Sequence, residues 1–244
     1  MENQVQGYNL KAPFVEVTLR INGVNRTHIF RKPSLADLIE YQKAERIASR
    51  IKEDGSIVTE SESQTAALGL WEKLCQEVRN YILPDGTDIT AQENWKTLIP
   101  EAHKIIAAQN IHRIGVDHEY PVAEIGFDEV AIALKAVQAG NLVRGLVHDF
   151  ALPKPSDMKL WQKLQAVSRM IRNKGEIVSV HDSRLDCEVM IYDRLIRAVD
   201  GYVSDGVIPP LAQLVEIMDP QHKSVAIREL FERLNNAQES DPLA

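Results

Sequence analysis

The sequence lacks the short motifs that identify most enzymes and cofactor-binding proteins. No glycine-rich loop follows a strand pattern and opens a helix pattern, which argues against a phosphate-binding loop and a dinucleotide-binding fold. No two histidines have the four-residue spacing of a metal site on one helix face. We therefore expect no catalytic residues, no cofactor-binding residues, no metal site and no cofactor, which favours a non-enzymatic protein over an enzyme.

Export signals and long apolar runs are also missing. The residues after Met1 form neither the basic nor the apolar part of a secretory signal, and no run approaches the roughly 20 apolar residues that span a bilayer. The only two cysteines, Cys75 and Cys187, lie in helical patterns, and we expect both to be reduced. These absences predict a cytoplasmic protein with no membrane partner.

The chain contains fewer basic residues than acidic residues. The chain has 28 Lys and Arg against 35 Asp and Glu, a formal net charge of −7. Nonspecific nucleic-acid binding depends on Lys and Arg that neutralise phosphates, so we expect no nucleic-acid partner. An acidic surface favours a protein partner instead.

Short segments of the first half recur in the second half at a nearly constant spacing. The matches are Lys32-Pro33-Ser34 with Lys154-Pro155-Ser156, Tyr41-Gln42-Lys43 with Trp161-Gln162-Lys163, and Trp71-Glu72-Lys73-Leu74 with Tyr192-Asp193-Arg194-Leu195. This pattern predicts an internal duplication. The predicted organisation is a repeat unit at 1–115, a connector at 116–126, a second repeat unit at 127–236 and a disordered tail at 237–244.

Each predicted repeat begins with a β-hairpin. Apolar residues alternate over 14–21, Asn22-Gly23 is a strong hairpin turn signal, and a return strand reaches Phe30. In the second repeat we expect strands over 130–139 and 142–150, with a turn at Gly140-Asn141. We also expect the two hairpins to join in one four-stranded sheet.

Helices follow each predicted hairpin. Ser34 and Asp37 have the spacing of a capping box, and apolar positions from Leu35 to Ile51 predict a long helix that ends near Gly55. A second long helix is predicted over 67–81, and two short helices begin near Asp88 and Pro100. The predicted counterparts are a helix capped by Ser156 that ends at Gly175, a helix over 185–202, and helices that begin near Pro209 and Pro220, the last capped by Asp219.

The predicted fold class is therefore α+β and predominantly helical. It consists of two tandem pseudo-symmetric repeats, each a β-hairpin followed by three or four helices.

Three groups of polar residues are candidates for metal binding or catalysis. His112, Asp117, His118 and Glu119 cluster in and just before the connector but fit no regular ligand pattern, so we interpret them as solvated linker residues. His181-Asp182 stands in a loop without a nucleophile beside it. His103-Lys104 and His222-Lys223 occur at the start of the last helix of each repeat, and we interpret them as tolerated surface residues.

The tryptophans have simpler interpretations. Trp71 and Trp161 lie on or beside apolar stripes and are expected in the core. Trp95 fits either the core or an interface anchor, with the core favoured.

The sequence of the first predicted hairpin and helix cap resembles that of a known protein family. Residues 17–40, with Val17-Thr18-Leu19-Arg20-Ile21-Asn22-Gly23 and then Phe30-Arg31-Lys32-Pro33-Ser34-Leu35-Ala36-Asp37-Leu38, resemble phage tail assembly chaperones. Such proteins often open with a short hairpin that leads through a Pro-Ser or Pro-Thr cap into a long helix. The resemblance implies a non-enzymatic prophage protein that holds a tail component, typically the tape-measure protein, in a soluble state.

The leading hypothesis is therefore a protein-interaction or assembly factor, with a phage tail protein as the partner that the resemblance implies. Two alternatives stay open. One is an enzyme with a site in the cleft between the two repeats, and the other is a phage tail structural subunit. A homo-oligomer also stays open, because repeats can exchange elements with a second chain.

Overall fold

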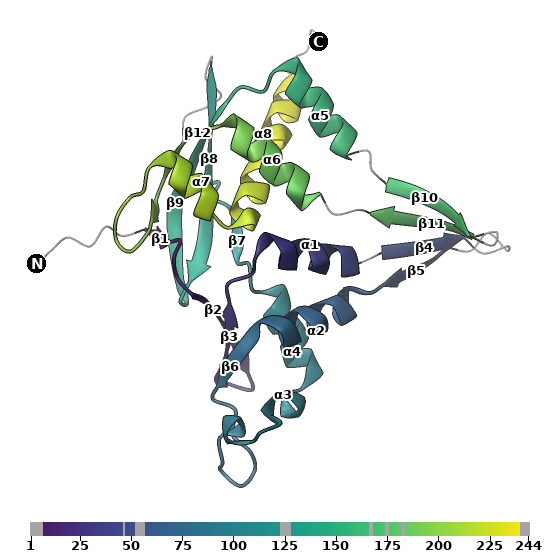
Figure 1. Ribbon diagram of the computed structural model, residues 1–244, viewed down its shortest axis with the longest axis vertical. Coiled ribbons are helices and arrows are strands. Elements are labelled where there is room, and N and C mark those ends of the chain that lie inside the picture. Colours follow the sequence, from purple (N-terminus) through teal and green to yellow (C-terminus); the bar gives the residue numbers. More distant parts are fainter. Residues whose placement is uncertain are drawn as a thin grey trace, which may run out of the picture. The chain divides into compact units, whose positions relative to one another are not determined.

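The computed structural model describes residues 7–45, 47–51, 57–122, 128–165, 168–173, 176–181 and 184–239. The chain forms two compact units (Figure 1). The larger unit comprises residues 1–12, 112–164 and 184–244, and the smaller unit comprises residues 13–111 and 165–183.

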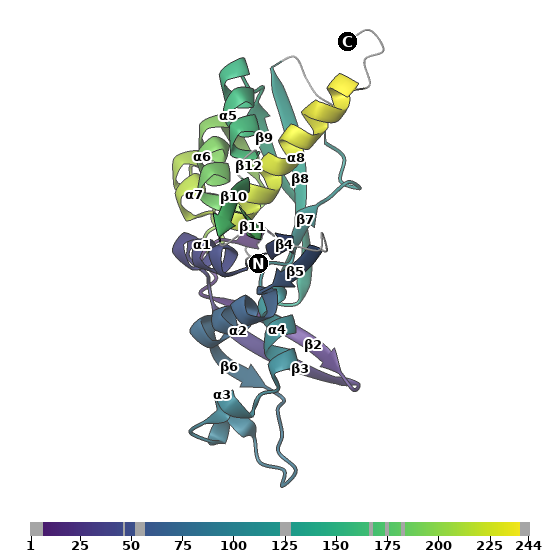
Figure 2. The same ribbon diagram turned by 90° about the vertical axis from the view of Figure 1, so that its right-hand side faces the viewer.

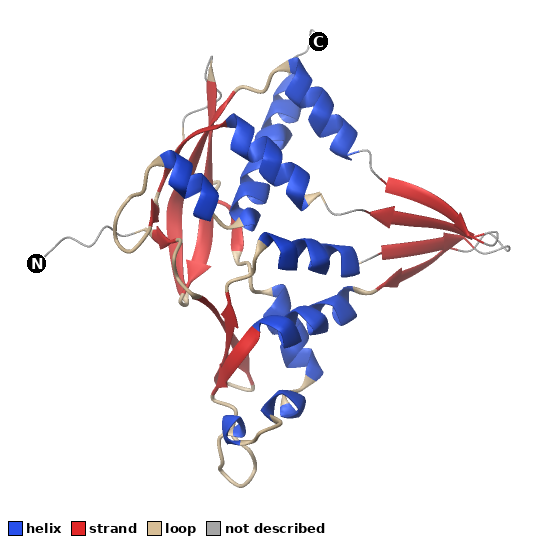
Figure 3. Ribbon diagram, in the orientation of Figure 1, coloured by secondary structure: helices blue, strands red, loops and turns tan. Residues whose placement is uncertain are grey.

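The fold is α+β, but two parts of the predicted fold class are wrong. Strands make up a large part of the structure beside the helices (Figure 3), so the fold is not predominantly helical. The chain also does not form two clear tandem repeats of a hairpin and three or four helices, because each compact unit is discontinuous in sequence and further strands separate the helices. Both errors come from segments that were expected to continue helices and that form strands instead.

The smaller unit begins with the predicted hairpin, which is confirmed. Strands β2 (Phe14–Ile21) and β3 (Val24–Arg31) pair antiparallel around Asn22 and Gly23. Both turn residues have positive φ, 51° and 81°, a conformation that asparagine and glycine tolerate best. Strand β6 (Cys75–Arg79) pairs with β3 and completes a three-stranded sheet in the order β2-β3-β6.

Helix α1 (Leu35–Ala44) begins as predicted and ends earlier than predicted. Ser34 Oγ accepts a hydrogen bond from the Asp37 backbone N–H at 3.2 Å, and Asp37 Oδ2 accepts one from the Ser34 backbone N–H at 2.9 Å. This confirms the capping box. The predicted continuation toward Gly55 is wrong, because strand β4 (Ile47–Ile51) starts three residues after the helix ends.

Strand β4 belongs to a second sheet of the smaller unit. It pairs with β5 (Ile57–Ser61) on one side and with β11 (Glu176–His181) on the other, and β11 pairs with β10 (Ser168–Asn173). The order is β10-β11-β4-β5. The four-residue spacing of Ile47 and Ile51 fits a helix and a strand equally well, so local periodicity could not separate the two.

Helix α2 (Ser63–Leu74) is also shorter than predicted. The helix expected to reach Tyr81 stops at Leu74, and Cys75 begins β6 at once. Its apolar spacing continues through Val78 and Tyr81, which mimics a helix. The segment forms a strand instead because it provides hydrogen-bond partners for the second edge of β3.

The rest of the smaller unit covers one face of the β2-β3-β6 sheet. The predicted short helices are confirmed as the 3₁₀ helix η1 (Ile89–Ala91), capped by Asp88, and helix α4 (Glu101–Gln109) after Pro100; α3 (Trp95–Leu98) lies between them. Helices α2 and α4 pack together against the sheet (Figure 2). The core between them includes Val17, Leu19, Phe30, Trp71, Leu74, Val78 and Ile99, which confirms the core position of Trp71.

The larger unit contains the second predicted hairpin, which is confirmed. Strands β8 (Glu129–Gln138) and β9 (Asn141–Ala151) turn at Ala139 and Gly140, one residue earlier than expected. Strand β7 (Ile114–Val116) pairs with β8 and strand β12 (Ile196–Asp200) pairs with β9, giving the order β12-β9-β8-β7. The expectation that both predicted hairpins share one sheet is wrong, because β2 and β3 belong to the β2-β3-β6 sheet and β8 and β9 to the β12-β9-β8-β7 sheet.

The described part of the larger unit also contains four helices: α5 (Pro155–Gln165), α6 (Leu185–Leu195), α7 (Leu211–Ile217) and α8 (Pro220–Glu239). Helix α5 begins at Pro155, so Ser156 is not the predicted cap, and the helix ends ten residues before the expected stop at Gly175. Helix α6 gives way to β12 after Leu195, well before the predicted end at residue 202.

Helix α8 begins as predicted but runs further. Asp219 Oδ1 accepts a hydrogen bond from the Gln221 backbone N–H at 2.9 Å, which confirms the cap. The helix continues to Glu239, so residues 237–239 of the predicted disordered tail are helical, while 240–244 lie outside the described residues. Helix α8 packs against α6, β7 and β8 (Figure 2). The Trp161 ring stacks on the ring of Phe231, a residue of α8, with 4.4 Å between the ring centroids. This confirms Trp161 as a core residue.

The larger unit also contains a short pair of parallel strands. Strand β1 (Tyr8–Asn9) pairs with β13 (Tyr202–Val203). Gly201 lies just before β13 with φ of 81°, and a Cβ atom there would overlap the Gly145 carbonyl oxygen. Only glycine allows this close approach of two backbone segments.

Both cysteines are free thiols, as predicted. Burial raises the pKa of the Cys75 thiol to about 12, so it stays protonated at neutral pH. Within the described residues, no helix combines the length and the apolar character needed to cross a membrane.

Candidate functional site

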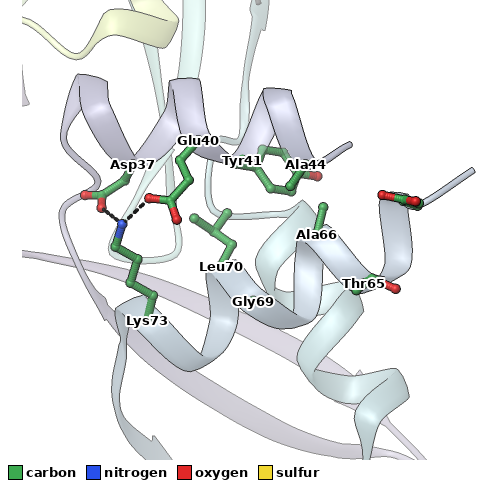
Figure 4. A pocket seen from close by; sticks show the side chains of 10 residues that line it. Asp37, Glu40, Tyr41, Ala44, Thr65, Ala66, Gly69, Leu70 and Lys73 are labelled. Atoms are coloured by element: carbon green, nitrogen blue, oxygen red, sulfur yellow. Dashed lines mark hydrogen bonds and ion pairs between the residues drawn. The ribbon is translucent and has the colours of Figure 1, made fainter. Parts of the chain in front are cut away.

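A groove lies between α1 and α2 of the smaller unit (Figure 4). Its volume is about 180 Å³. We call it the α1–α2 groove and define it by its lining residues: Asp37, Glu40, Tyr41 and Ala44 from α1, Glu62 from the residue before α2, and Thr65, Ala66, Gly69, Leu70 and Lys73 from α2.

The middle of the groove is apolar. Leu70 and Ala66 are each only 6% exposed and point from α2 toward α1, where the Tyr41 ring is half-buried (Figure 4). Gly69 lies beside them on α2 and is exposed, and a Cβ atom built there would have nothing within 4 Å. The missing side chain at Gly69 therefore helps to keep the groove open.

One end of the groove is closed by a charged cluster. The Asp37 carboxylate, 5% exposed, accepts hydrogen bonds from Arg31 at 2.8 and 3.1 Å and pairs with Lys73 Nζ at 2.9 Å. Lys73 Nζ also pairs with Glu40 Oε2 at 2.6 Å. The hydrogen bonds from Arg31 hold the pKa of Asp37 well below its usual range, so this carboxylate is ionised at any physiological pH.

The remaining polar groups give the groove an acidic rim. Three carboxylates line it, those of Asp37, Glu40 and Glu62; Arg31 and Lys73 pair with the first two, so the cluster keeps an excess of one negative charge. The Tyr41 hydroxyl donates a hydrogen bond to Glu45 Oε1 at 3.1 Å, and burial together with this carboxylate raises the tyrosine pKa. The rim is therefore suited to positive charge.

This arrangement has the properties of a binding surface and lacks those of a reactive site. Asp37 is fully engaged by cations and cannot act as a base near neutral pH, and the hydrogen bond to Glu40 raises the pKa of Lys73, which keeps it protonated. The lining residues that the structure describes include no histidine and no cysteine. What the groove offers is an apolar floor and a charged edge.

Comparisons of the chain with protein-family models, with curated proteins and with solved structures find no match.

The connector residues considered in the sequence do not form a metal site. Asp117 is 1% exposed and pairs with Arg144, whose Nε donates to Asp117 Oδ2 at 2.6 Å. Glu119 pairs with the same guanidinium at 3.0 Å. The described residues contain no group of three or more His, Cys, Asp or Glu positioned to hold a metal ion. Asp117 therefore fixes the connector to β9, and its interpretation as a solvated residue is wrong.

The other sequence candidates have different outcomes. His181 is the last residue of β11, its side chain is not described, and Asp182 lies outside the described residues. The interpretation of Lys104 and Lys223 as surface residues is wrong, because they are 6% and 5% exposed and pair with Glu72 and Asp193, each at 2.6 Å. Trp95 is partly buried against the core of the smaller unit.

His103 takes part in a buried network centred on His28, which the sequence did not reveal. Trp71 Nε1 donates to His28 Nδ1 at 3.1 Å, so the proton of the neutral His28 ring must lie on Nε2. That proton is donated to the Tyr81 hydroxyl at 3.0 Å, and Tyr81 in turn donates to His103 Nδ1 at 3.1 Å. Burial lowers the pKa of His28 to about 4, so the ring is neutral.

The larger unit has a network of similar composition. His148 is fully buried between the hydroxyls of Tyr192 at 2.7 Å and Tyr202 at 2.9 Å, and Tyr202 also contacts His222 Nδ1 at 2.8 Å. His222 is 3% exposed, so its interpretation as a surface residue is wrong. Neither His28 nor His148 lines the α1–α2 groove. We interpret both networks as structural, since their polar atoms satisfy one another inside the cores.

Proposed function

We propose that the protein is a non-enzymatic protein-interaction and assembly factor, and that the α1–α2 groove holds a segment of its partner. The main support for this proposal is an open groove that combines an apolar floor, formed by Leu70 and Ala66, with an acidic rim. Its volume of about 180 Å³ is below the range of roughly 300–1,000 Å³ typical of small-molecule pockets. It suits a single apolar side chain better than a cofactor.

The charge of the rim defines the partner more closely. An apolar side chain that enters the groove brings its flanking residues close to Glu40 and Glu62, which are exposed. Lysine or arginine beside the anchor would be attracted there, whereas aspartate or glutamate would be repelled. The net charge of −7 acts in the same direction. The proposed partner segment is therefore an apolar residue flanked by basic residues.

The resemblance to phage tail assembly chaperones supplies the proposed class of partner. Residues 17–40, which carry it, form β2, β3 and the first part of α1, and α1 is one wall of the groove. The segment with the resemblance thus also contributes Asp37 and Glu40 to the proposed binding surface. The partner would be a tail component, such as a tape-measure protein, that the groove keeps soluble before assembly.

Peptide binding tests the surface. The probes are fluorescein-labelled nine-residue peptides with a central leucine flanked on both sides by two lysines or by two glutamates. We expect fluorescence anisotropy to show tighter binding of the lysine peptide, weakened by added salt. Gly69→Trp fills the groove and should weaken binding at least about tenfold. The matched control, Gln213→Trp, places the same residue at an exposed position of α7 and should leave binding unchanged.

Co-expression tests the class of partner. We expect the protein to increase the soluble fraction of a tape-measure protein encoded beside it, and Gly69→Trp to abolish the increase while Gln213→Trp preserves it. Equal binding of the two peptides, or a tape-measure protein that stays insoluble with every variant, would contradict the proposal.

A further inference from the structure

In the part of the smaller unit that the structure describes, strand β2 has a neighbouring strand on one edge only, and its other edge is open. It is the terminal strand of the β2-β3-β6 sheet, and its eight residues pair with β3 without a register shift. Phe14, Glu16, Thr18 and Arg20 are exposed, while Val17 and Leu19 face the core. A long, regular edge strand is a template for pairing with another strand, and proteins usually shorten, bend or cover such edges.

The turn of the hairpin determines which backbone groups face outward. In a hairpin with a two-residue loop, the residues that flank the loop, here Ile21 and Val24, exchange both backbone hydrogen bonds. Hydrogen-bonded pairs then alternate along the strand, so Leu19, Val17 and Val15 direct their backbone groups toward β3. Those of Phe14, Glu16, Thr18 and Arg20 point away from β3, toward the open edge.

In the larger unit, the corresponding edge of a similar hairpin is paired with a further strand. Its β8–β9 hairpin also has a two-residue turn, and β7 lies antiparallel on the outer edge of β8. The hairpin β2–β3 has no strand at the equivalent edge among the described residues. An antiparallel strand on β2 would complete it in the same way.

We propose that β2 pairs with β2 of a second copy of this chain, antiparallel, about a twofold axis through Thr18. In this register Thr18 faces Thr18 of the second copy, and Glu16 faces Arg20 of the second copy on both sides of the axis. All of these residues have outward backbone groups, so roughly six main-chain hydrogen bonds form. The result is a continuous six-stranded sheet across the dimer.

The charges select this register over its neighbours. A shift of the axis to Glu16 or to Arg20 places like charges directly opposite, which is destabilising. A shift to Val17 or to Leu19 leaves both charges without an opposite partner. Within its own chain, Glu16 has only a 3.6 Å contact with exposed Arg79, and Arg20 forms no ion pair with any residue that the structure describes. Both side chains are therefore available to the second copy.

Charge exchange tests the pairing without disturbing the fold, because both side chains are exposed. We expect sedimentation velocity to show a dimer of the full-length protein. Glu16→Arg places arginine opposite arginine twice, and Arg20→Glu places glutamate opposite glutamate twice. Each variant alone should weaken dimerisation at least about tenfold, from cross-strand pair energies.

Two rescues are specific to this register. The double variant Glu16→Arg/Arg20→Glu restores both opposite-charge pairs and should dimerise like the unaltered protein. An equimolar mixture of the two single variants should form a heterodimer, because one copy then carries two arginines and the other two glutamates. The matched controls, Glu216→Arg and Arg197→Glu, change the same charges at exposed positions of the larger unit and should leave dimerisation unchanged.

Three outcomes would overturn the inference: an unaltered protein that stays monomeric at high micromolar concentration, single variants that dimerise normally, or a mixture that fails to associate. Circular dichroism of each variant verifies that the fold is retained. The groove variant Gly69→Trp should dimerise normally, so failure of the proposed partner site and failure of the dimer can be told apart.

Discussion

The buried histidines His28 and His148 should make the protein progressively less stable below pH 6.5. Burial lowers the pKa of His28 to about 4 and that of His148 to about 3, whereas the unfolded chain keeps a histidine pKa near 6.5. Between these values the unfolded state binds protons that the folded state does not, so a fall in pH favours unfolding. The full contribution of each neutral ring is therefore present only above pH 6.5.

The size of the effect follows from the pH interval. At pH 5 the solution is 1.5 units below the unfolded pKa and still above both folded values, so each histidine lowers the free energy of unfolding by about 2 kcal/mol relative to pH 8. Between pH 8 and pH 5 the lowered pKa of a carboxylate such as Asp37 has little influence, because unfolded aspartate titrates near pH 4. The difference between two proteins that differ only at one histidine therefore isolates that histidine.

Chemical denaturation at pH 8, 7, 6 and 5 measures this loss. In His28→Gln, an amide replaces the imidazole between Trp71 and Tyr81 without a titrating group, and the loss between pH 8 and pH 5 should shrink by about 2 kcal/mol. The comparison uses the pH dependence, so a constant destabilisation by the substitution does not affect it. NMR titration of the His28 ring supplies an independent value. Parallel pH profiles of both proteins, or a His28 ring that titrates near 6.5, would refute the reasoning.

Three further predictions concern stability and are measured as changes in the free energy of unfolding at neutral pH. Asp37→Asn removes the charge that holds Arg31 and should cost about 2–3 kcal/mol, because a buried ion pair loses one partner; a loss below 0.5 kcal/mol would show that solvent screens the cluster. Gly201→Ala should cost more than about 2 kcal/mol, since its Cβ atom would overlap the Gly145 carbonyl at positive φ, and a stable variant would contradict this geometry. Gly69→Ala, in the exposed middle of α2, should instead stabilise the protein by about 0.5–1 kcal/mol. A destabilised variant would mean that the groove is less open than described.

Features set by neighbouring residues could be predicted from the sequence. The turn at Asn22 and Gly23 depends on two residues that tolerate positive φ, and the cap of α1 depends on Ser34 and Asp37, three residues apart. Both are confirmed because no distant part of the chain is needed to define them.

Features set by distant residues were predicted wrongly. The segment after Leu74 has helical apolar spacing, and only its pairing with β3 makes it a strand. The α1–α2 groove was not predicted, because the capping role of Asp37 was evident from the sequence but its partners Arg31 and Lys73 come from other elements. Gly69 is the one hint in the sequence, because a glycine inside a helical pattern departs from the usual preference for other residues there.

The position of the β10–β11 hairpin affects how the chain can fold during synthesis. This hairpin is encoded between α5 and α6 of the larger unit, yet it pairs with β4 of the smaller unit. Strand β4 is therefore synthesised long before its partner β11. At typical elongation rates the edge of β4 stays unpaired for roughly ten seconds until β11 has been synthesised. Residues 13–111 expressed alone would keep that edge unpaired permanently. A fragment cut at the apparent midpoint of the sequence should accordingly aggregate more readily than the whole chain.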